Sequence, residues 1–201
     1  MHSEHNTNRF YIESLGCAKN QVDSEVLLNT LQEKGWTYVA QAEEADLIIV
    51  NSCGFIQPAK EETIETVLAF REAYPDKKVL LAGCFAQRYG NELSGQLPEA
   101  DGIFGNHDLR QIDTVSQQVM EGERPVVLPE WQYSPAYRSR LLSFPGSSYV
   151  KISEGCNHRC SFCAIPLIRG PLKSIPVEDI LRQIRELLQQ GIVEINLIAQ
   201  D

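Results

Sequence analysis

Three cysteines lie close together in one short stretch, EGCNHRCSFC, which runs from Glu154 to Cys163. Cys156, Cys160 and Cys163 are spaced CxxxCxxC, and we call them the second cysteine group; His158 lies between the first two. Thiols at this spacing can form a disulfide, bind zinc, act as a redox pair or hold an iron–sulfur cluster. The residues therefore indicate thiol chemistry but leave its kind open.

The surroundings of the second cysteine group favour one of these chemistries. A structural zinc site usually takes ligands from a second half-site, and His158, on a tight loop between two cysteines, is poorly placed for tetrahedral coordination. An odd number of thiols in a reducing compartment disfavours a disulfide. Iron–sulfur ligation through three thiolates is the better match, and we expect His158 to be an exposed loop residue.

The other three cysteines, Cys17, Cys53 and Cys84, form the first cysteine group, and each follows a predicted parallel strand, in SLGC, VNSCG and LAGC. Carboxyl ends of parallel strands share one edge of a sheet, where ligands bind. We expect the three thiols to meet there and to share a ligand, a metal centre with one open position. The alternative is three small buried side chains packed beneath the sheet.

The segments that must position these thiols alternate between strand and helix. Strands are predicted at residues 9–15, 46–52, 77–83 and 102–104, and helices at 22–35, 59–73, from about 85 and at about 109–120. Asp23 and Ser24 are available to cap the helix that Gly35 ends. This alternation predicts an α/β fold for residues 9–121, a doubly wound parallel sheet.

The remaining segments predict a linker and a second domain. Residues 122–147 contain scattered prolines and no sustained period, as in a linker. Residues 148–201 contain a strand, the second cysteine group, a helix between Pro176 and Gly191, and a buried strand. Because one β/α/β unit cannot cover its own sheet faces, we expect a piece of a longer protein, cut just inside its second domain. Residues 1–8 are polar and predict a disordered tail.

Composition narrows the class of protein. The chain has 201 residues, 43% of them hydrophobic and 22% charged, as in an ordinary globular protein. No apolar run approaches the roughly 18 residues of a membrane helix, and the N-terminus lacks a secretory signal. We therefore expect a cytoplasmic protein. The net charge of −9 argues against a dedicated RNA-binding protein and suits a basic protein partner.

Together these motifs resemble a known family. CNHRCSFC resembles the signature of radical S-adenosylmethionine enzymes, with aromatic Phe162 before the last cysteine. SLGCAKNQVDSE, VNSCGFI, AGC and EGCNHRCSFCAIPLIRG resemble the methylthiotransferase family within it, over residues 9–201. GCAKN and CAIPLIRG are similar to the branch that modifies an aspartate of a ribosomal protein. The branch that modifies tRNA typically has GCQMN and VVPYTRG at these places.

The resemblance implies a fold, a cofactor set and a reaction. The second domain would be the start of the partial β/α barrel of radical S-adenosylmethionine enzymes, truncated, and we expect this fragment alone to be inactive. In this family each cysteine group holds a 4Fe–4S cluster. The second cluster binds S-adenosylmethionine and generates a 5′-deoxyadenosyl radical, and the auxiliary cluster, held by the first cysteine group, carries the methylated sulfur. The product is a methylthio group on the β-carbon of an aspartate in the twelfth small-subunit ribosomal protein. The implied partners are that protein, free or on the ribosome, and an electron donor such as a flavodoxin or ferredoxin, with no membrane and no tRNA substrate.

Other residues have weaker assignments. The resemblance implies that Phe162 contacts adenine through its backbone, although packing alone could explain an aromatic residue there. Gln200 and Asp201 lie at a strand end where barrel active sites form. Asn20 and Asn51 lie near the first cysteine group, where they could equally be turn or cap residues. Arg169 could serve the substrate or solvate a loop, and no general acid or base is singled out. The rival functions are a tRNA-adenosine methylthiotransferase and a non-catalytic iron–sulfur or zinc protein.

Overall fold

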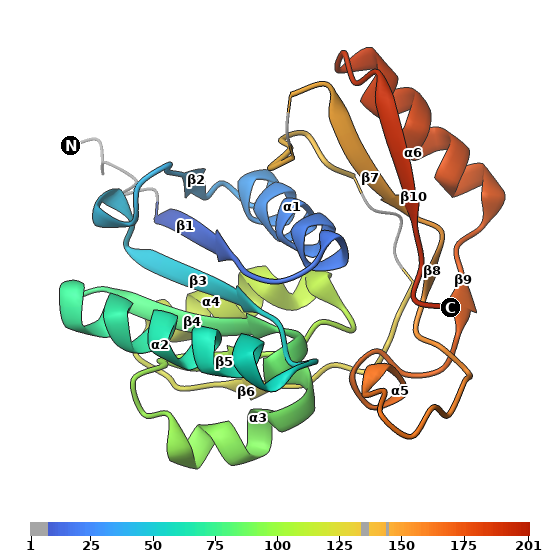
Figure 1. Ribbon diagram of the computed structural model, residues 1–201. Helices are drawn as coiled ribbons and strands as arrows, with labels where there is room; N and C mark the ends of the chain where they lie inside the picture. Colours follow the sequence, from blue (N-terminus) through green and yellow to red (C-terminus); the bar gives the residue numbers. More distant parts are fainter. Residues whose placement is uncertain (1–7, 134–136, 144) are drawn as a thin grey trace, which may run out of the picture.

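The computed structural model describes residues 8–133, 137–143 and 145–201, and nearly all of the predicted N-terminal tail lies outside these ranges. Its largest element is a six-stranded parallel sheet in the order β2-β1-β3-β4-β5-β6 (Figure 1). The strands are β1 (Arg9–Ser14), β2 (Thr37–Tyr38), β3 (Leu47–Ser52), β4 (Lys78–Gly83), β5 (Gly102–Phe104) and β6 (Val126–Val127). The predicted doubly wound α/β fold is confirmed.

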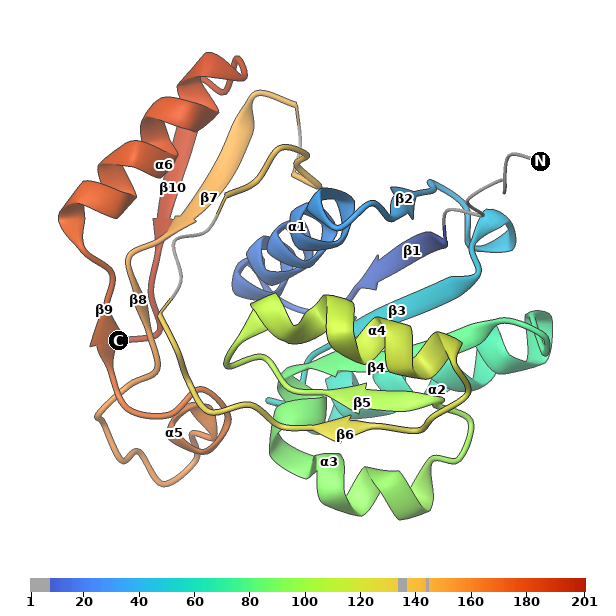
Figure 2. The same cartoon turned by 180° about the vertical axis from the view of Figure 1, so that it is seen from behind.

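Helices cover both faces of this sheet, as Figures 1 and 2 show from opposite sides. One face packs against α1 (Ala18–Glu33) and α4 (Ile112–Met120), and the other against α2 (Gln57–Ala73) and α3 (Cys84–Gln96). The central strands are mostly apolar because their residues alternate between two cores: Leu47 and Ile49 face α1, whereas Ile48 and Val50 face α2. Short helices η1 (Ala42–Glu44) and η2 (Leu109–Gln111) lie in the connections.

Helix α1 differs from its prediction at one end. It begins at Ala18 with Cys17 at the N-cap position, so the predicted caps Asp23 and Ser24 lie buried inside the helix. The sequence misled here because polar residues near a helix start are usually caps. In this helix Asp23 instead forms ion pairs with Lys151 and Arg169, which come from a second layer of protein. Ser24 bonds to Ser14 and Asn51 of the sheet. At the other end Gly35 takes a φ of +90° and ends the helix, as predicted.

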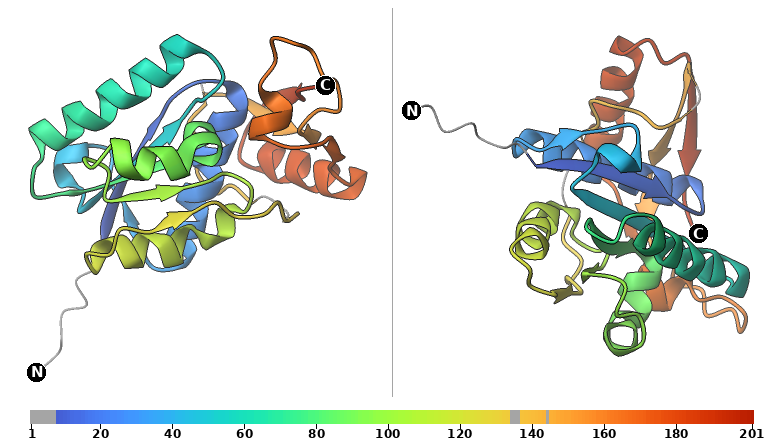
Figure 3. Two further views of the ribbon diagram at one scale, coloured as in Figure 1. Left: turned by 90° about the horizontal axis from the view of Figure 1, so that it is seen from below. Right: turned by 90° about the vertical axis from the view of Figure 1, so that its left-hand side faces the viewer.

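Residues 145–201 form a smaller unit beside α1 (Figure 3). Parallel strands β7 (Ser147–Lys151) and β10 (Glu194–Ile198) pack against α6 (Val177–Gln189). Strand β10 was predicted to be buried, but Leu197 is 58% exposed. The reason is that α6 covers one face of this strand pair. The unit also contains β8 (Ser153–Glu154), α5 (Ile165–Ile168) and β9 (Lys173–Ser174).

The segment predicted as a linker contains more structure than expected. Strand β6 pairs with β5 and extends the sheet. Further along, the buried Arg138 forms an ion pair with Glu25 of α1 at 2.6 Å. The Leu142 N–H also donates to Glu25, at 2.9 Å. This segment therefore packs against the helix rather than passing over it. Across the described ranges, no helix is long and apolar enough to span a membrane.

Candidate functional site

The first cysteine group lines one cavity of about 900 Å³ at the carboxyl edge of the sheet. Its wall continues through the start of α2 and then through residues of the smaller unit, Ile165, Ile168, Arg169, Ile198 and Gln200. Three residues that are far apart in sequence thus reach one space, as the strand-end argument predicted. As placed, no three cysteine, histidine or carboxylate side chains of the described chain are arranged to hold a metal ion.

Two glycines make this convergence possible. Gly16 and Gly83 each have a φ of +93°, a backbone conformation that is unfavourable for residues with a side chain. A Cβ atom on Gly16 would lie 2.7 Å from Cβ of Cys53, and one on Gly83 would lie 2.3 Å from Oδ1 of Asn51. The backbone at both strand ends is therefore packed too closely for a side chain, and this closeness brings the cysteines to one edge.

The three thiols of the first cysteine group differ in their environments. Cys17 is exposed, Cys53 is intermediate and Cys84 is buried. Burial raises the pKa of the Cys84 thiol to about 11. Its sulfur accepts hydrogen bonds from Nδ2 of Asn106 at 3.3 Å and Nη2 of Arg169 at 3.2 Å, and its thiol donates to Oδ1 of Asn20 at 3.2 Å. Cys84 is thus the most tightly held of the three.

The second cysteine group lies in one loop between β8 and α5. The Cys156 N–H donates to the Gly170 carbonyl at 3.2 Å, and the Cys163 N–H donates to the Cys160 carbonyl at 3.0 Å. Before them, Gly155 has a φ of +70°, and a Cβ there would lie 2.3 Å from the Pro171 carbonyl oxygen. These contacts fold the loop back on the segment that follows it.

Three residues predicted to bind a cofactor lie around this loop. Oε1 of Gln200 accepts a hydrogen bond from the Gly155 N–H at 3.0 Å, and Gln200 also lines the large cavity. An Asp201 carboxylate oxygen lies 2.8 Å from Nε2 of His158. The side chain of His158 is exposed, which confirms it as an exposed loop residue. Phe162 is 86% exposed. The contacts of Phe162, Gln200 and Asp201 with a cofactor remain predictions.

The comparisons with known proteins follow this division of the chain. Residues 9–105 match the family described as Uncharacterized protein family UPF0004, and residues 150–201 match the Radical SAM superfamily. Ribosomal protein uS12 methylthiotransferase RimO of Treponema denticola is 48% identical over 92% of this chain. The chain belongs to the radical S-adenosylmethionine methylthiotransferase family.

Proteins with the same name from other bacteria give the same picture. The relative from Syntrophomonas wolfei is 44% identical over 94% of this chain, and that from Chlorobium luteolum is 44% identical over all of it. The chain spans 42–44% of the length of these three methylthiotransferases. Membership of the family implies 4Fe–4S clusters and S-adenosylmethionine.

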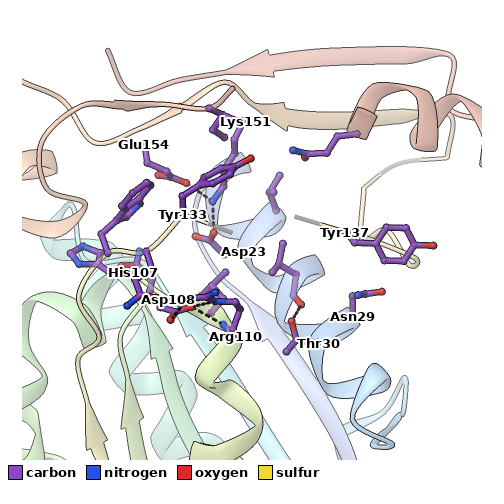
Figure 4. Close-up of a pocket in the computed structure, with 18 of the residues that line it drawn as sticks. Asp23, Asn29, Thr30, His107, Asp108, Arg110, Tyr133, Tyr137, Lys151 and Glu154 are labelled. Atoms are coloured by element: carbon purple, nitrogen blue, oxygen red, sulfur yellow. Dashed lines mark hydrogen bonds and ion pairs between the residues drawn. The ribbon is translucent and has the colours of Figure 1, made fainter. Parts of the chain in front are cut away.

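Beside the cysteines of this methylthiotransferase family member lies a buried ionic cluster that the sequence analysis missed. Arg169, one of its members, is 4% exposed, which excludes the interpretation that it solvates a loop. Its Nη2 donates to Asp23 at 2.7 Å and its Nη1 to Glu154 at 3.1 Å. Lys151 donates to the same two carboxylates, and Lys19 lies 3.5 Å from Glu154. Figure 4 shows Asp23 on α1 facing Lys151 of the smaller unit.

The pKa values in the ionic cluster follow from burial and charge. Burial lowers the pKa of Lys19 to about 8, despite the attraction of Glu154. Burial alone would raise the pKa of Glu154, but Lys151, Arg169 and Lys19 hold it well below its usual range. Burial alone would lower the pKa of Arg169, but Asp23 and the other anionic partners raise it. Glu154 and Arg169 therefore remain charged at neutral pH.

Two asparagines are more than turn or cap residues. Nδ2 of Asn20 donates to the Ser52 carbonyl at 2.7 Å, and Nδ2 of Asn51 donates to the Asn20 carbonyl at 2.8 Å. They tie the start of α1 to the end of β3, next to the cavity. A signal for this was present in KNQVD, because Lys19, Asn20 and Asp23 share one helix face. Polar residues along one face of a helix that packs inside the protein indicate that this face contacts other polar groups.

Proposed function

We propose that this chain is part of an enzyme that adds a methylthio group to the β-carbon of an aspartate in ribosomal protein uS12. The observation that carries the proposal is the shared cavity, in which the first cysteine group meets residues from the radical S-adenosylmethionine segment. Sulfur insertion needs a place where both parts of the molecule reach one substrate. Relatives named as uS12 methylthiotransferases support the choice of reaction.

Two 4Fe–4S clusters fit the residues that are present. The donor set is right, because each group offers three thiols and so leaves one iron open. The first cysteine group would hold the auxiliary cluster in the large cavity, and the second cysteine group would hold the other. When bound, the clusters and S-adenosylmethionine supply the one-electron chemistry that an unactivated C–H bond requires.

The chain's own residues position the two groups and bind the ligands. Gln200 joins the cavity wall to the loop of the second cysteine group through the Gly155 N–H. Apolar side chains in the cavity wall, Phe55 and Ile56 before α2 and Ile165 in α5, limit water around the reacting atoms. Phe162, Gln200 and Asp201 would contact S-adenosylmethionine.

Charge supports a protein substrate. With a net charge of −9, the chain attracts a basic ribosomal protein more readily than an RNA stem. The partners we infer are uS12, free or within the small subunit, and an electron donor such as a flavodoxin or ferredoxin, in the cytoplasm. Residues 9–121 would form one domain, to which β6 adds a strand, 122–147 would otherwise form the linker, and 148–201 the start of a second domain.

Mass spectrometry tests the substrate. The full-length protein is offered uS12 and tRNA together with S-adenosylmethionine, a reductant and a sulfide source. We expect the methylthio mass on the uS12 aspartate and none on tRNA. The mass on a tRNA adenosine instead would assign the chain to the RNA-modifying branch. Zinc in place of about eight iron atoms per chain would favour a non-catalytic protein.

A further inference from the structure

The sulfur of Cys84 has an unusual environment within the first cysteine group. Among the described residues it is the one cysteine sulfur with side-chain hydrogen-bond partners, and its two donors are Arg169 and Asn106. Both donors are buried, at 4% and 8% exposure. Arg169 comes from the smaller unit, so a ligand of one cysteine group is bonded to the segment that follows the other.

The guanidinium of Arg169 is fixed in this position. Besides the sulfur, its Nη2 donates to Asp23 at 2.7 Å and to Oδ1 of Asn20 at 2.9 Å, while Nη1 donates to Glu154 at 3.1 Å. Arg169 also lines both the large cavity and a second one of about 460 Å³. It is therefore part of the wall between them and cannot turn away without breaking these bonds.

Holding the two units together does not by itself require the sulfur contact. Lys151 is buried beside Arg169 and bonds to the same carboxylates, Asp23 and Glu154. It has no bond to a sulfur in the described chain. The two cations thus share one electrostatic role, and the hydrogen bond to Cys84 is what separates them.

We propose that Arg169, assisted by Asn106, is a positioning residue that raises the reduction potential of the centre held by the first cysteine group. The inference rests on the proposed function, because it takes Cys84 as a cluster ligand. Hydrogen bonds to a ligating sulfur stabilise the more negative, reduced state of an iron–sulfur centre. A charged donor does so more strongly than a neutral one, so Arg169 contributes more than Asn106.

The test isolates the first centre. In the full-length protein Cys156, Cys160 and Cys163 are replaced by alanine, iron and sulfide are restored, and the midpoint potential is measured by a redox titration followed by electron paramagnetic resonance. In this background we compare Arg169→Met with the matched control Lys151→Met, which removes a charge from the same carboxylates. We expect Arg169→Met to lower the ratio of reduced to oxidised centre at least tenfold at a fixed potential, which corresponds to a fall of about 59 mV in the midpoint potential. Lys151→Met should shift the midpoint potential less than half as far.

Two further variants keep the test decisive. Arg169→Lys keeps the charge but loses the planar fork, and it replaces Arg169→Met where that variant does not fold. Asn106→Leu removes a neutral donor and should lower the potential by a smaller amount. Equal potentials in the Arg169 and Lys151 variants, with about four iron atoms bound, would overturn this inference alone. A background protein that binds no iron would overturn the ligand assignment and with it the proposed function.

Discussion

The first cysteine group comes from the ends of three separate strands of one parallel sheet, whereas the second cysteine group lies within eight residues of a single loop. The first is assembled by tertiary structure and depends on glycines packed against neighbouring strands. The second is assembled by local hydrogen bonds within and just after its loop. One site should therefore fail when the sheet is damaged, and the other should survive many changes to the rest of the molecule.

The largest expected effect separates the two groups by function. Replacing any cysteine of the second group by alanine in the full-length protein should abolish reductive cleavage of S-adenosylmethionine. Replacing Cys17, Cys53 or Cys84 should spare some cleavage and abolish the methylthiolated product, because radical formation needs only the other centre. The measurements are 5′-deoxyadenosine by chromatography and product by mass spectrometry. Product from a Cys84→Ala protein would remove the first group from sulfur delivery.

A glycine in each region tests how the sites are built. Gly83→Ala places a Cβ 2.3 Å from Oδ1 of Asn51 and 2.7 Å from the Ser52 nitrogen, at a φ of +93°. We expect a loss of at least about 3 kcal/mol in the free energy of unfolding, measured by denaturant titration. Gly155→Ala is equally strained, but it should disorder the second group's loop and leave the unfolding of the sheet nearly unchanged.

Gly35→Ala is the matched control for backbone strain alone. Gly35 has a φ of +90°, and a Cβ added there would meet no atom within 4 Å. Gly35→Ala should lower the free energy of unfolding by about 1–2 kcal/mol, the cost of placing alanine in the left-handed conformation. A Gly83→Ala loss no larger than this would show that close packing at the strand end is not what holds the first group.

The same contrast explains what the sequence could predict. The end of each apolar strand is a local signal, so Cys53 and Cys84 were placed correctly at one edge from the pattern of β3 and β4. The contact of Arg169 with Cys84 joins residues 85 positions apart and depends on how two units dock. Asp23 looked like a cap because nothing nearby in sequence reveals the layer that covers α1. Local periodicity determines elements, and docking between units determines which polar residues become buried.

A smaller effect should appear in acid. The folded pKa of Glu154 lies below its ordinary value of 4.5, so above that pH its charge stabilises the fold. As pH falls below about 4.5 the unfolded chain takes up the proton first, and this stabilisation is lost. As the pH falls through this range, the parent protein should lose at least about 1 kcal/mol more of its free energy of unfolding than Glu154→Gln does. One pKa unit is worth about 1.4 kcal/mol.

The control for the acid effect is an exposed carboxylate on a helix that covers the sheet. Glu61→Gln removes a similar group from an exposed position on α2. It should leave the pH dependence of unfolding unchanged, because no pairing in a buried environment is lost. Identical acid profiles for the Glu154 and parent proteins would contradict the assignment of a charged, stabilising Glu154 to the contact between α1 and the smaller unit.

The smallest expected effect on stability concerns Phe162, in the loop of the second group. Its side chain is 86% exposed, so Phe162→Ala should change the free energy of unfolding by no more than about 0.5 kcal/mol. If the Phe162 ring contacts S-adenosylmethionine in addition to the backbone, the same variant should bind it several-fold more weakly. Leu167, 69% exposed in the neighbouring helix α5, is the matched control with no predicted cofactor contact. Calorimetric titration should separate the two alanine variants, and equal affinities would leave the Phe162 ring without a part in binding.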